Sequence, residues 1–336
     1  MGHRANLVIV ENGTADVRFD QWGALSLPGY LFWGPHSSLA YFRSCDQPEN
    51  GEWLDHVWCE GAALMDLDHK VMMFFGGDEL EGHIPQRREY LALMGKMWPG
   101  WEIRWAVEGL ADIAEYAGMG RDKVIARNEK EVLSEENLLA ALTGHGEQDE
   151  NTYAAACLSF KSTDGKLKLF LSEFQSCEAI VGFGAGLINL CRNQTGIERL
   201  NLNCFPASGI HIDEQKKLIE YWVSGAMPQL LDEIKRAWEP YEIRFIGNDF
   251  EKHLNQCGGR LSINIPGRTQ LLEAIKPVAC LDIQEELMAD QSFFIRMIIK
   301  AMELLSYLTK KNASPKLPPM AARRKIFDEI AASPKP

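Results

Sequence analysis

A near-repeat, 140 residues apart, is the feature of this sequence that most constrains its fold. Residues 98–105 read Trp-Pro-Gly-Trp-Glu-Ile-Arg-Trp and residues 238–245 read Trp-Glu-Pro-Tyr-Glu-Ile-Arg-Phe, so the two segments align without gaps. Gly118 and Gly258 match at the same offset. The chain of 336 residues has the length of about two domains. The repeat therefore predicts an internal duplication into two similar lobes, and two copies are too few for a solenoid.

The predicted elements follow a similar order in both halves of the chain. Asn12-Gly13, between residues 5–10 and 14–19, predicts a β-hairpin, because both turn residues accept a positive φ. A second hairpin is expected over residues 57–66 and 70–75, and the second half is expected to open with a hairpin over residues 153–160 and 166–172. Helices are expected to follow in each half. The fold class is therefore α+β, with two similar lobes of mixed or antiparallel sheets and helices, and a long C-terminal helix.

Two strands are expected within the repeat itself, over residues 101–107 and 241–246. Successive side chains of a strand point to opposite faces, so the aromatic and Ile side chains of residues 101–105 share one face. Glu102 and Arg104 share the other face. This alternation predicts a Glu/Arg ion pair on the sheet surface or between the lobes, repeated in the second half.

Two segments are assigned from local composition alone. Residues 22–35 are rich in Trp, Gly and Pro and are expected to form a loop. Asp213 stands before a stretch ending at Trp222 and is expected to cap a helix there.

Composition shifts divide the chain into four parts. We expect a first α+β lobe that is acidic and rich in tryptophan (1–145), a second lobe (151–262), a helical segment with a long buried helix from Asp282 to about Thr309 (263–311), and a basic, Pro-rich tail ending in a short helix (312–336).

The charge is concentrated in the first half. Residues 1–150 carry 12 Lys and Arg against 26 Asp and Glu, a net charge of −14, whereas residues 309–336 carry a net charge of +5. Nucleic-acid binding needs a surface rich in Lys and Arg, so the acidic half argues against a nucleic-acid partner. A basic protein is the partner that this half favours, although acidity also keeps a protein soluble.

The cysteines and the hydropathy pattern indicate a cytoplasmic protein. None of the eight cysteines forms a CxxC pair, and several lie in apolar runs, which is typical of reduced, buried thiols. The N-terminus shows no signal-peptide pattern. Residues 281–308 form the most apolar long stretch, but they contain seven charged residues, too many for a membrane span.

Tryptophan is the most unusual residue of the first half, which holds seven of the nine in the chain within 105 residues. Four of them stand in or beside predicted loops and are the candidate binding residues: Trp22, Trp33, Trp53 and Trp58. Indole rings within an acidic surface suit a basic protein or a cationic ligand. The alternative is a small core covered by loops. The first interpretation predicts a binding protein without enzymatic activity, comparable to an inhibitor or an immunity protein.

A hydrolase-like enzyme is the competing function, with its site in a cleft between the lobes near residues 55–83 and a divalent metal as a further option. Its candidate catalytic residues are His56, Cys59, Asp78 and Glu79. Its candidate metal ligands are Asp66, His69, Asp78 and His83. Carboxylates and imidazoles are plausible ligands of divalent cations, but the segment has no HxH or HxxxH spacing.

Two short motifs are similar to nucleotide-binding signatures. Residues 75–79, Phe-Gly-Gly-Asp-Glu, resemble the signature of diguanylate cyclases, but the upstream metal and nucleotide contacts of that family are missing. Residues 182–186, Gly-Phe-Gly-Ala-Gly, resemble a dinucleotide-binding turn, but position 187 is Leu where the motif needs its third Gly. The sequence therefore predicts no cofactor.

Overall fold

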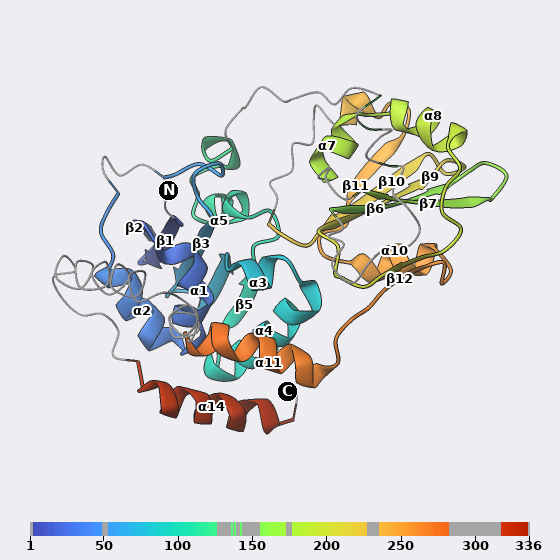
Figure 1. The fold of residues 1–336 in the computed structure, drawn as a ribbon. Helices are drawn as coiled ribbons and strands as arrows, with labels where there is room; N and C mark the ends of the chain where they lie inside the picture. The colour runs from blue at the N-terminus through green and yellow to red at the C-terminus, as the bar shows by residue number, and fades with distance from the viewer. Residues whose placement is uncertain are drawn as a thin grey trace, which may run out of the picture. The chain divides into compact units, whose positions relative to one another are not determined.

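A computed structural model gives the architecture of two units (Figure 1). It describes residues 3–48, 53–125, 136, 138, 142, 155–172, 177–226, 235–281 and 317–334. Unit 1 comprises Met1–Glu81, Pro85–Ala126 and Pro266–Pro336, and unit 2 comprises Gly82–Ile84 and Arg127–Ile265.

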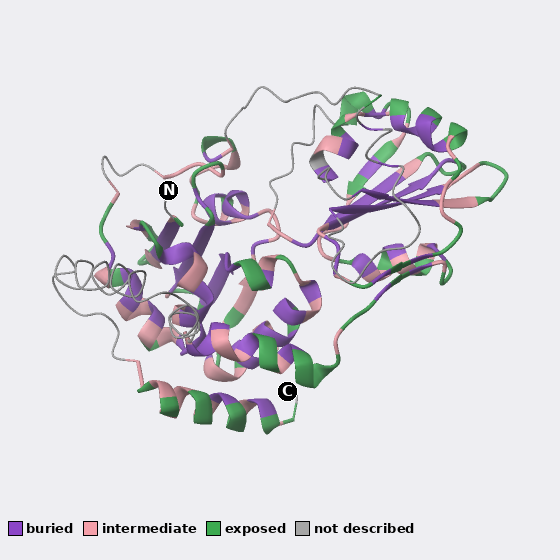
Figure 2. Ribbon diagram, viewed as in Figure 1, coloured by how far each residue is buried: buried purple, intermediate pink, exposed green. Residues whose placement is uncertain are grey.

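Unit 1 is built on a five-stranded mixed sheet with the strand order β2-β1-β3-β4-β5. Its strands are β1 (Ala5–Glu11), β2 (Thr14–Asp20), β3 (Gly61–Asp66), β4 (Val71–Phe75) and β5 (Glu102–Trp105). Its helical elements are α1 (Gly23–Phe32), α2 (Pro35–Ser44), α3 (Asp78–Glu81), α4 (Ile84–Met97), α5 (Leu110–Tyr116), the 3-10 turn η2 (Arg121–Lys123), α11 (Arg268–Cys280) and α14 (Met320–Ala332). Strands β3 and β4 are buried along their whole length (Figure 2), so the core of unit 1 lies on both faces of its central strands.

Unit 2 is built on a second five-stranded mixed sheet, of order β11-β10-β9-β6-β7, and a two-stranded sheet of β8 and β12. Its strands are β6 (Ala156–Lys161), β7 (Leu167–Ser172), β8 (Leu200–Leu202), β9 (Ser208–Asp213), β10 (Leu218–Val223), β11 (Glu242–Phe245) and β12 (Leu261–Ile263). Its helices are α7 (Cys177–Gly182), α8 (Gly186–Asn193) and α10 (Phe250–Gln256).

The two five-stranded sheets have the same topology. In unit 1, β1 pairs antiparallel with β2 and parallel with β3, β3 pairs antiparallel with β4, and β4 pairs parallel with β5. In unit 2, β6, β7, β9, β10 and β11 repeat these five roles in the same chain order and with the same directions. The predicted α+β class with two similar lobes is confirmed, and its origin by duplication stays a prediction.

The near-repeat lies at equivalent places in the two sheets. Residues 102–105 form the last strand of the first sheet, and residues 242–245 form the last strand of the second. Arg104 makes two hydrogen bonds to Glu102, at 2.7 and 2.8 Å, and Arg244 makes two to Glu242, at 2.6 and 2.9 Å. The predicted sheet-surface ion pair is therefore present in both units.

The turn between β3 and β4 and the turn between β9 and β10 also correspond. The Asp66 carboxylate accepts the backbone N–H of His69, and the Asp213 carboxylate accepts that of Lys216. The residue that ends each turn, Lys70 or Lys217, has a positive φ, 55° and 52°. Four-residue turns of this kind are stabilised by the Asp side chain, because it bonds the backbone locally.

The predictions for residues 22–35 and 213–222 are wrong. Residues 23–32 form α1 despite Pro28 and Gly29, because Leu27 and Leu31 are fully buried and burial outweighs weak helix propensity. Gly29 lets the helix approach Leu281, since a Cβ there would lie 2.2 Å from a Leu281 methyl. Asp213 accepts the backbone N–H of Lys216 as a helix cap would, but it closes the β9–β10 turn instead.

Helix α14 confirms the predicted terminal helix and packs on unit 1. Phe327 is 1% exposed in the unit 1 core. The Lys96 ammonium donates to the carbonyl oxygens of Ile330 and Ser333 at the C-terminus of the helix. The predicted long helix over 282–309 lies outside the described residues. Of the residues that are described, no helix has the length and apolar character needed to cross a membrane.

Candidate functional site

The four tryptophans selected from the sequence have different environments. Trp33 is 7% exposed and donates from Nε1 to the carbonyl of Ala279, 2.9 Å away, so it is a core residue. Trp53 is half-buried. Trp22 and Trp58 are 51% and 57% exposed and are among the most exposed large apolar residues that the structure describes.

Trp22 and Trp58 are linked by the first described residues of the chain. The His3 ring lies 6.5 Å from the Trp22 ring, and the Arg4 guanidinium lies 5.1 Å from the centre of the Trp58 ring. The Glu60 carboxylate accepts the backbone N–H of Arg4 and lies 3.5 Å from the His3 ring nitrogen. With the exposed Val57, these residues form one surface, here named the Trp22–Trp58 patch: His3, Arg4, Trp22, Val57, Trp58 and Glu60.

The chain around this patch is acidic. Residues 44–69 contain seven Asp and Glu and no Lys or Arg. Asp55 shapes the loop, because its carboxylate accepts the backbone N–H groups of Val57 and Trp58 at 3.0 and 3.2 Å. Trp58 is thus presented on a turn within an acidic segment.

The candidate catalytic residues of the hydrolase interpretation have separate surroundings. His56 is placed by contacts to Val124, which directly follows η2. The Cys59 thiol is buried, and burial raises its pKa to about 12, so it is protonated and a poor nucleophile at neutral pH. Asp78 and Glu79 are exposed at the start of α3.

The candidate metal ligands are held by other interactions. Asp66 is buried, and its carboxylate bonds the backbone of residues 68 and 69, the His69 ring at 2.8 Å and the Tyr116 hydroxyl at 2.8 Å. Asp66 and His69 therefore form the β3–β4 turn. His83 belongs to unit 2, where its ring lies 4.8 Å from that of Phe205.

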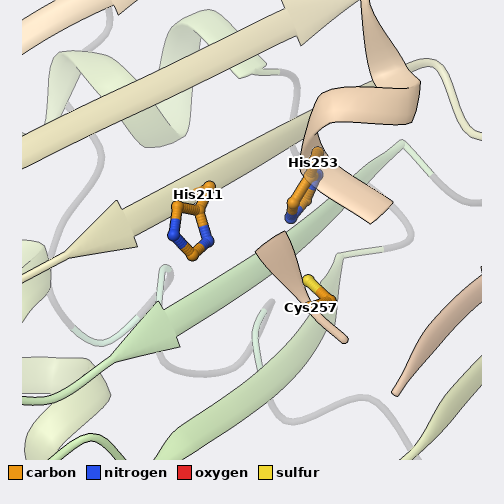
Figure 3. A group of neighbouring side chains, drawn as sticks. All are labelled: His211, His253 and Cys257. Atoms are coloured by element: carbon orange, nitrogen blue, oxygen red, sulfur yellow. The ribbon is translucent and has the colours of Figure 1, made fainter. Parts of the chain in front are cut away.

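A different cluster, in unit 2, was missed by sequence analysis. Among the described residues, His211, His253 and Cys257 are the set of three potential metal-ligating side chains whose ligand atoms lie within 4.8 Å of one another (Figure 3). His211 comes from β9, His253 from α10, and Cys257 directly follows α10. All three are at most 3% exposed.

Ser159 of β6 joins the two histidines. Its hydroxyl lies 2.7 Å from Nδ1 of His211 and 2.7 Å from Nε2 of His253. The Trp222 indole lies 3.2 Å from the other nitrogen of His253, Nδ1. Ser159 and Trp222 are also buried. We name these four residues, Ser159, His211, Trp222 and His253, the histidine network.

The indole determines the direction of the hydrogen bonds. An indole N–H only donates, so Nδ1 of His253 accepts and the proton of the neutral ring is on Nε2. Nε2 of His253 then donates to the Ser159 hydroxyl, and Ser159 donates to Nδ1 of His211. The network is a directed chain in which both rings are neutral.

Burial keeps the rings neutral. It lowers the pKa of His211 to about 4 and the pKa of His253 to about 3, because a charged imidazole is poorly solvated there. The nearby Asp213 and Glu220 carboxylates oppose this shift at His211. Burial also raises the pKa of the Cys257 thiol. At neutral pH the cluster therefore carries no charge.

Two histidines and one cysteine are side-chain types that suit zinc, but the hydrogen bonds that the histidines make do not suit a metal. A histidine that binds a metal through Nε2 carries its proton on Nδ1 and donates it to an acceptor. In this protein Nδ1 of His253 faces the indole N–H of Trp222, which is a donor. A metal on Nε2 would also have to separate His253 from Ser159. The arrangement fits a closed network of neutral groups better than a metal centre.

Comparisons of this chain with protein-family models, with curated proteins and with solved structures found no match. The Trp22–Trp58 patch and the histidine network are the two local arrangements of this protein that bear on its function.

Proposed function

We propose that the protein is a binding protein whose unit 1 engages a basic protein partner through the Trp22–Trp58 patch. The observation that carries the proposal is the exposure of two tryptophans, 51% for Trp22 and 57% for Trp58, which the adjoining residues His3 and Arg4 contact. Tryptophan is enriched among the residues that dominate binding energy at protein interfaces. An inhibitor or an immunity protein would use such a surface.

Arginine is the partner side chain that the patch fits best. Arg4 already places its guanidinium over the Trp58 ring, which shows that this ring accepts a stacked cation. Trp22 has no such guanidinium among the contacts of the described residues, and its neighbour is the His3 ring. The acidic segment of residues 44–69 would attract a basic surface and speed its association.

The proposal is tested by removing the two exposed rings together. Trp22→Ser with Trp58→Ser should weaken binding of a fluorescent oligoarginine peptide at least ~10-fold, because stacked and apolar contacts are lost while the acidic residues stay. Fluorescence anisotropy at low salt measures the affinity. Raising the salt concentration should weaken the remaining electrostatic binding.

Ile265→Ser is the matched control, because Ile265 is an exposed apolar residue of unit 2. It should leave peptide binding unchanged. If the double tryptophan variant binds the peptide as tightly as the unmodified protein does, the acidic charge alone accounts for binding and the patch is not the binding surface.

A further inference from the structure

The histidine network is a property of unit 2 and not of the shared fold. The strand registers and the 140-residue offset of the near-repeat give the equivalent positions in unit 1. The positions of Ser159, His211 and His253 are held there by fully buried apolar residues: Val8, Leu64 and Ile113, respectively. Unit 1 therefore has the same sheet topology without these polar groups, whereas unit 2 contains them.

The surroundings are shaped around this network. A Cβ atom on Gly209 would lie 2.3 Å from the Trp222 indole nitrogen and 2.6 Å from Nδ1 of His253. The indole and imidazole therefore pack directly on the backbone of β9, at a position that only glycine leaves open. Helix α10 contacts β9 at this place, and His253 is the residue of α10 that enters the network.

We propose that the histidine network is an acid-sensitive latch that holds α10 on the sheet of unit 2 and releases it in mildly acidic solution. A second proton on the His253 ring would be placed on Nδ1, directly against the N–H of Trp222. That proton removes the acceptor of the indole and introduces a buried cation. Protonation of His211 adds a second cation, with the two ring centres 5.9 Å apart.

The charged groups around the network do not neutralise these cations fully. His211 is influenced by the Asp213 and Glu220 carboxylates and, in the opposite sense, by two lysines. The Glu220 carboxylate is already bonded by Lys252 and Gln256 of α10. His253 is influenced by His211, which disfavours its charge. The titratable groups that face the network are Lys161 of β6, Asp213 of β9, Lys216 of the following turn, Glu220 of β10, and Cys257 after α10.

The direction of the pH effect follows from the histidine pKa values. Both are lowered in the folded unit from 6.5, to about 4 and about 3, so an unfolded chain takes up protons first as the pH falls. The stabilisation by neutral rings is complete above pH 6.5 and is lost progressively below it. At pH 5 the folding equilibrium of unit 2 should be weaker by roughly 30-fold for each histidine, or roughly 1000-fold for both.

Unit 1 provides an internal control, because two of its partly buried carboxyl groups respond in the opposite sense. Burial raises the pKa of Glu81 to about 7 and that of Asp112 to about 6. A carboxyl group whose pKa is raised in the folded state takes up its proton there first, so it stabilises the fold as the pH falls through this range. Unit 1 should therefore keep its protection at pH 5 while unit 2 loses it.

The test is hydrogen exchange of the full chain at pH 7 and pH 5, corrected for the intrinsic pH dependence of amide exchange. Peptides from β6, β9 and α10 should lose protection at pH 5, and peptides from β1, β3 and α5 should not. In His211→Leu with His253→Ile, which installs the residues of unit 1, the difference between the two pH values should disappear from unit 2. His36→Leu, at an exposed histidine, should behave like the unmodified protein.

Several outcomes would overturn the latch. One is that unit 2 of the unmodified protein stays protected from exchange at pH 5. Another is that the double variant loses protection at pH 5 as the unmodified protein does. If the double variant does not fold, NMR titration of the histidine rings decides: neutral rings at pH 5 in the folded protein support the latch, and titration near pH 6.5 contradicts it. One zinc ion per purified chain, lost in His253→Ile, would assign the cluster to a metal and also contradict it.

Discussion

Replacing Trp98 or Trp238 by alanine should destabilise the unit that contains it by about 3–5 kcal/mol. These tryptophans begin the two copies of the near-repeat and are 1% and 0% exposed. Trp98 donates to the carbonyl of Leu31, and Trp238 donates to that of Val181, both at 2.8 Å. Alanine would leave a large cavity and an unsatisfied buried carbonyl at the end of α1 or α7.

Hydrogen exchange resolved by peptide measures this effect unit by unit. Trp98→Ala should lower the protection of β3 and β4, and Trp238→Ala should lower that of β9 and β10. Trp22→Ala is the control and should change neither, because that ring is half exposed. A loss of protection in the unit that does not contain the substitution, equal to that in its own unit, would contradict the placement of each tryptophan in the core of its own unit.

Replacing Gly34 or Gly184 by alanine should destabilise the corresponding unit by about 2–4 kcal/mol. The two glycines follow α1 and α7 and have φ values of 91° and 75°, which residues with a Cβ rarely adopt. A Cβ would lie 2.8 Å from the Met97 carbonyl oxygen at Gly34 and 2.5 Å from the Ala237 carbonyl oxygen at Gly184. Each glycine thus lets the chain pass close to the residue before the tryptophan that begins each segment of the near-repeat.

Thermal or urea unfolding compares these variants with Gly95→Ala and Gly182→Ala. A Cβ at either control position meets nothing within 4 Å, so alanine should be neutral or slightly stabilising there. Equal stabilities for Gly34→Ala and Gly95→Ala, or for Gly184→Ala and Gly182→Ala, would show that the close approach to the carbonyl oxygen has no energetic role.

The sequence predicts the paired architecture where the pattern is local. Asn12-Gly13 predicts the first hairpin, and the alternation over residues 101–105 predicts that Trp101, Ile103 and Trp105 pack against the core. The sequence fails where burial or turn chemistry outweighs propensity. Helix α1 contains Pro28, and the Asp213 turn uses the same backbone bond as a helix cap. Local composition does not distinguish these cases.

The candidate sites were predictable to different degrees. Trp22 and Trp58 were predicted to be exposed because they stand in or beside predicted loops. The same rule also selected Trp33, which is buried and bonded to Ala279 of α11. His211 and His253 are separated by 42 residues and by two strands, so no spacing rule brings them together. An alignment of the two halves by their strand registers would have revealed them, because the positions that are polar in the second half are apolar at the equivalent places of the first half.

Photo-cross-linking from the Trp22–Trp58 patch is the measurement that tests the proposed function most directly. A benzoylphenylalanine placed at position 22, 58 or 265 in turn, in cells that make the protein, captures whatever contacts that position. We predict that positions 22 and 58 cross-link to the same protein, that this protein has an excess of Lys and Arg, and that position 265 does not capture it. Capture of this protein only from position 265, or of unrelated proteins from positions 22 and 58, would contradict the proposed binding surface.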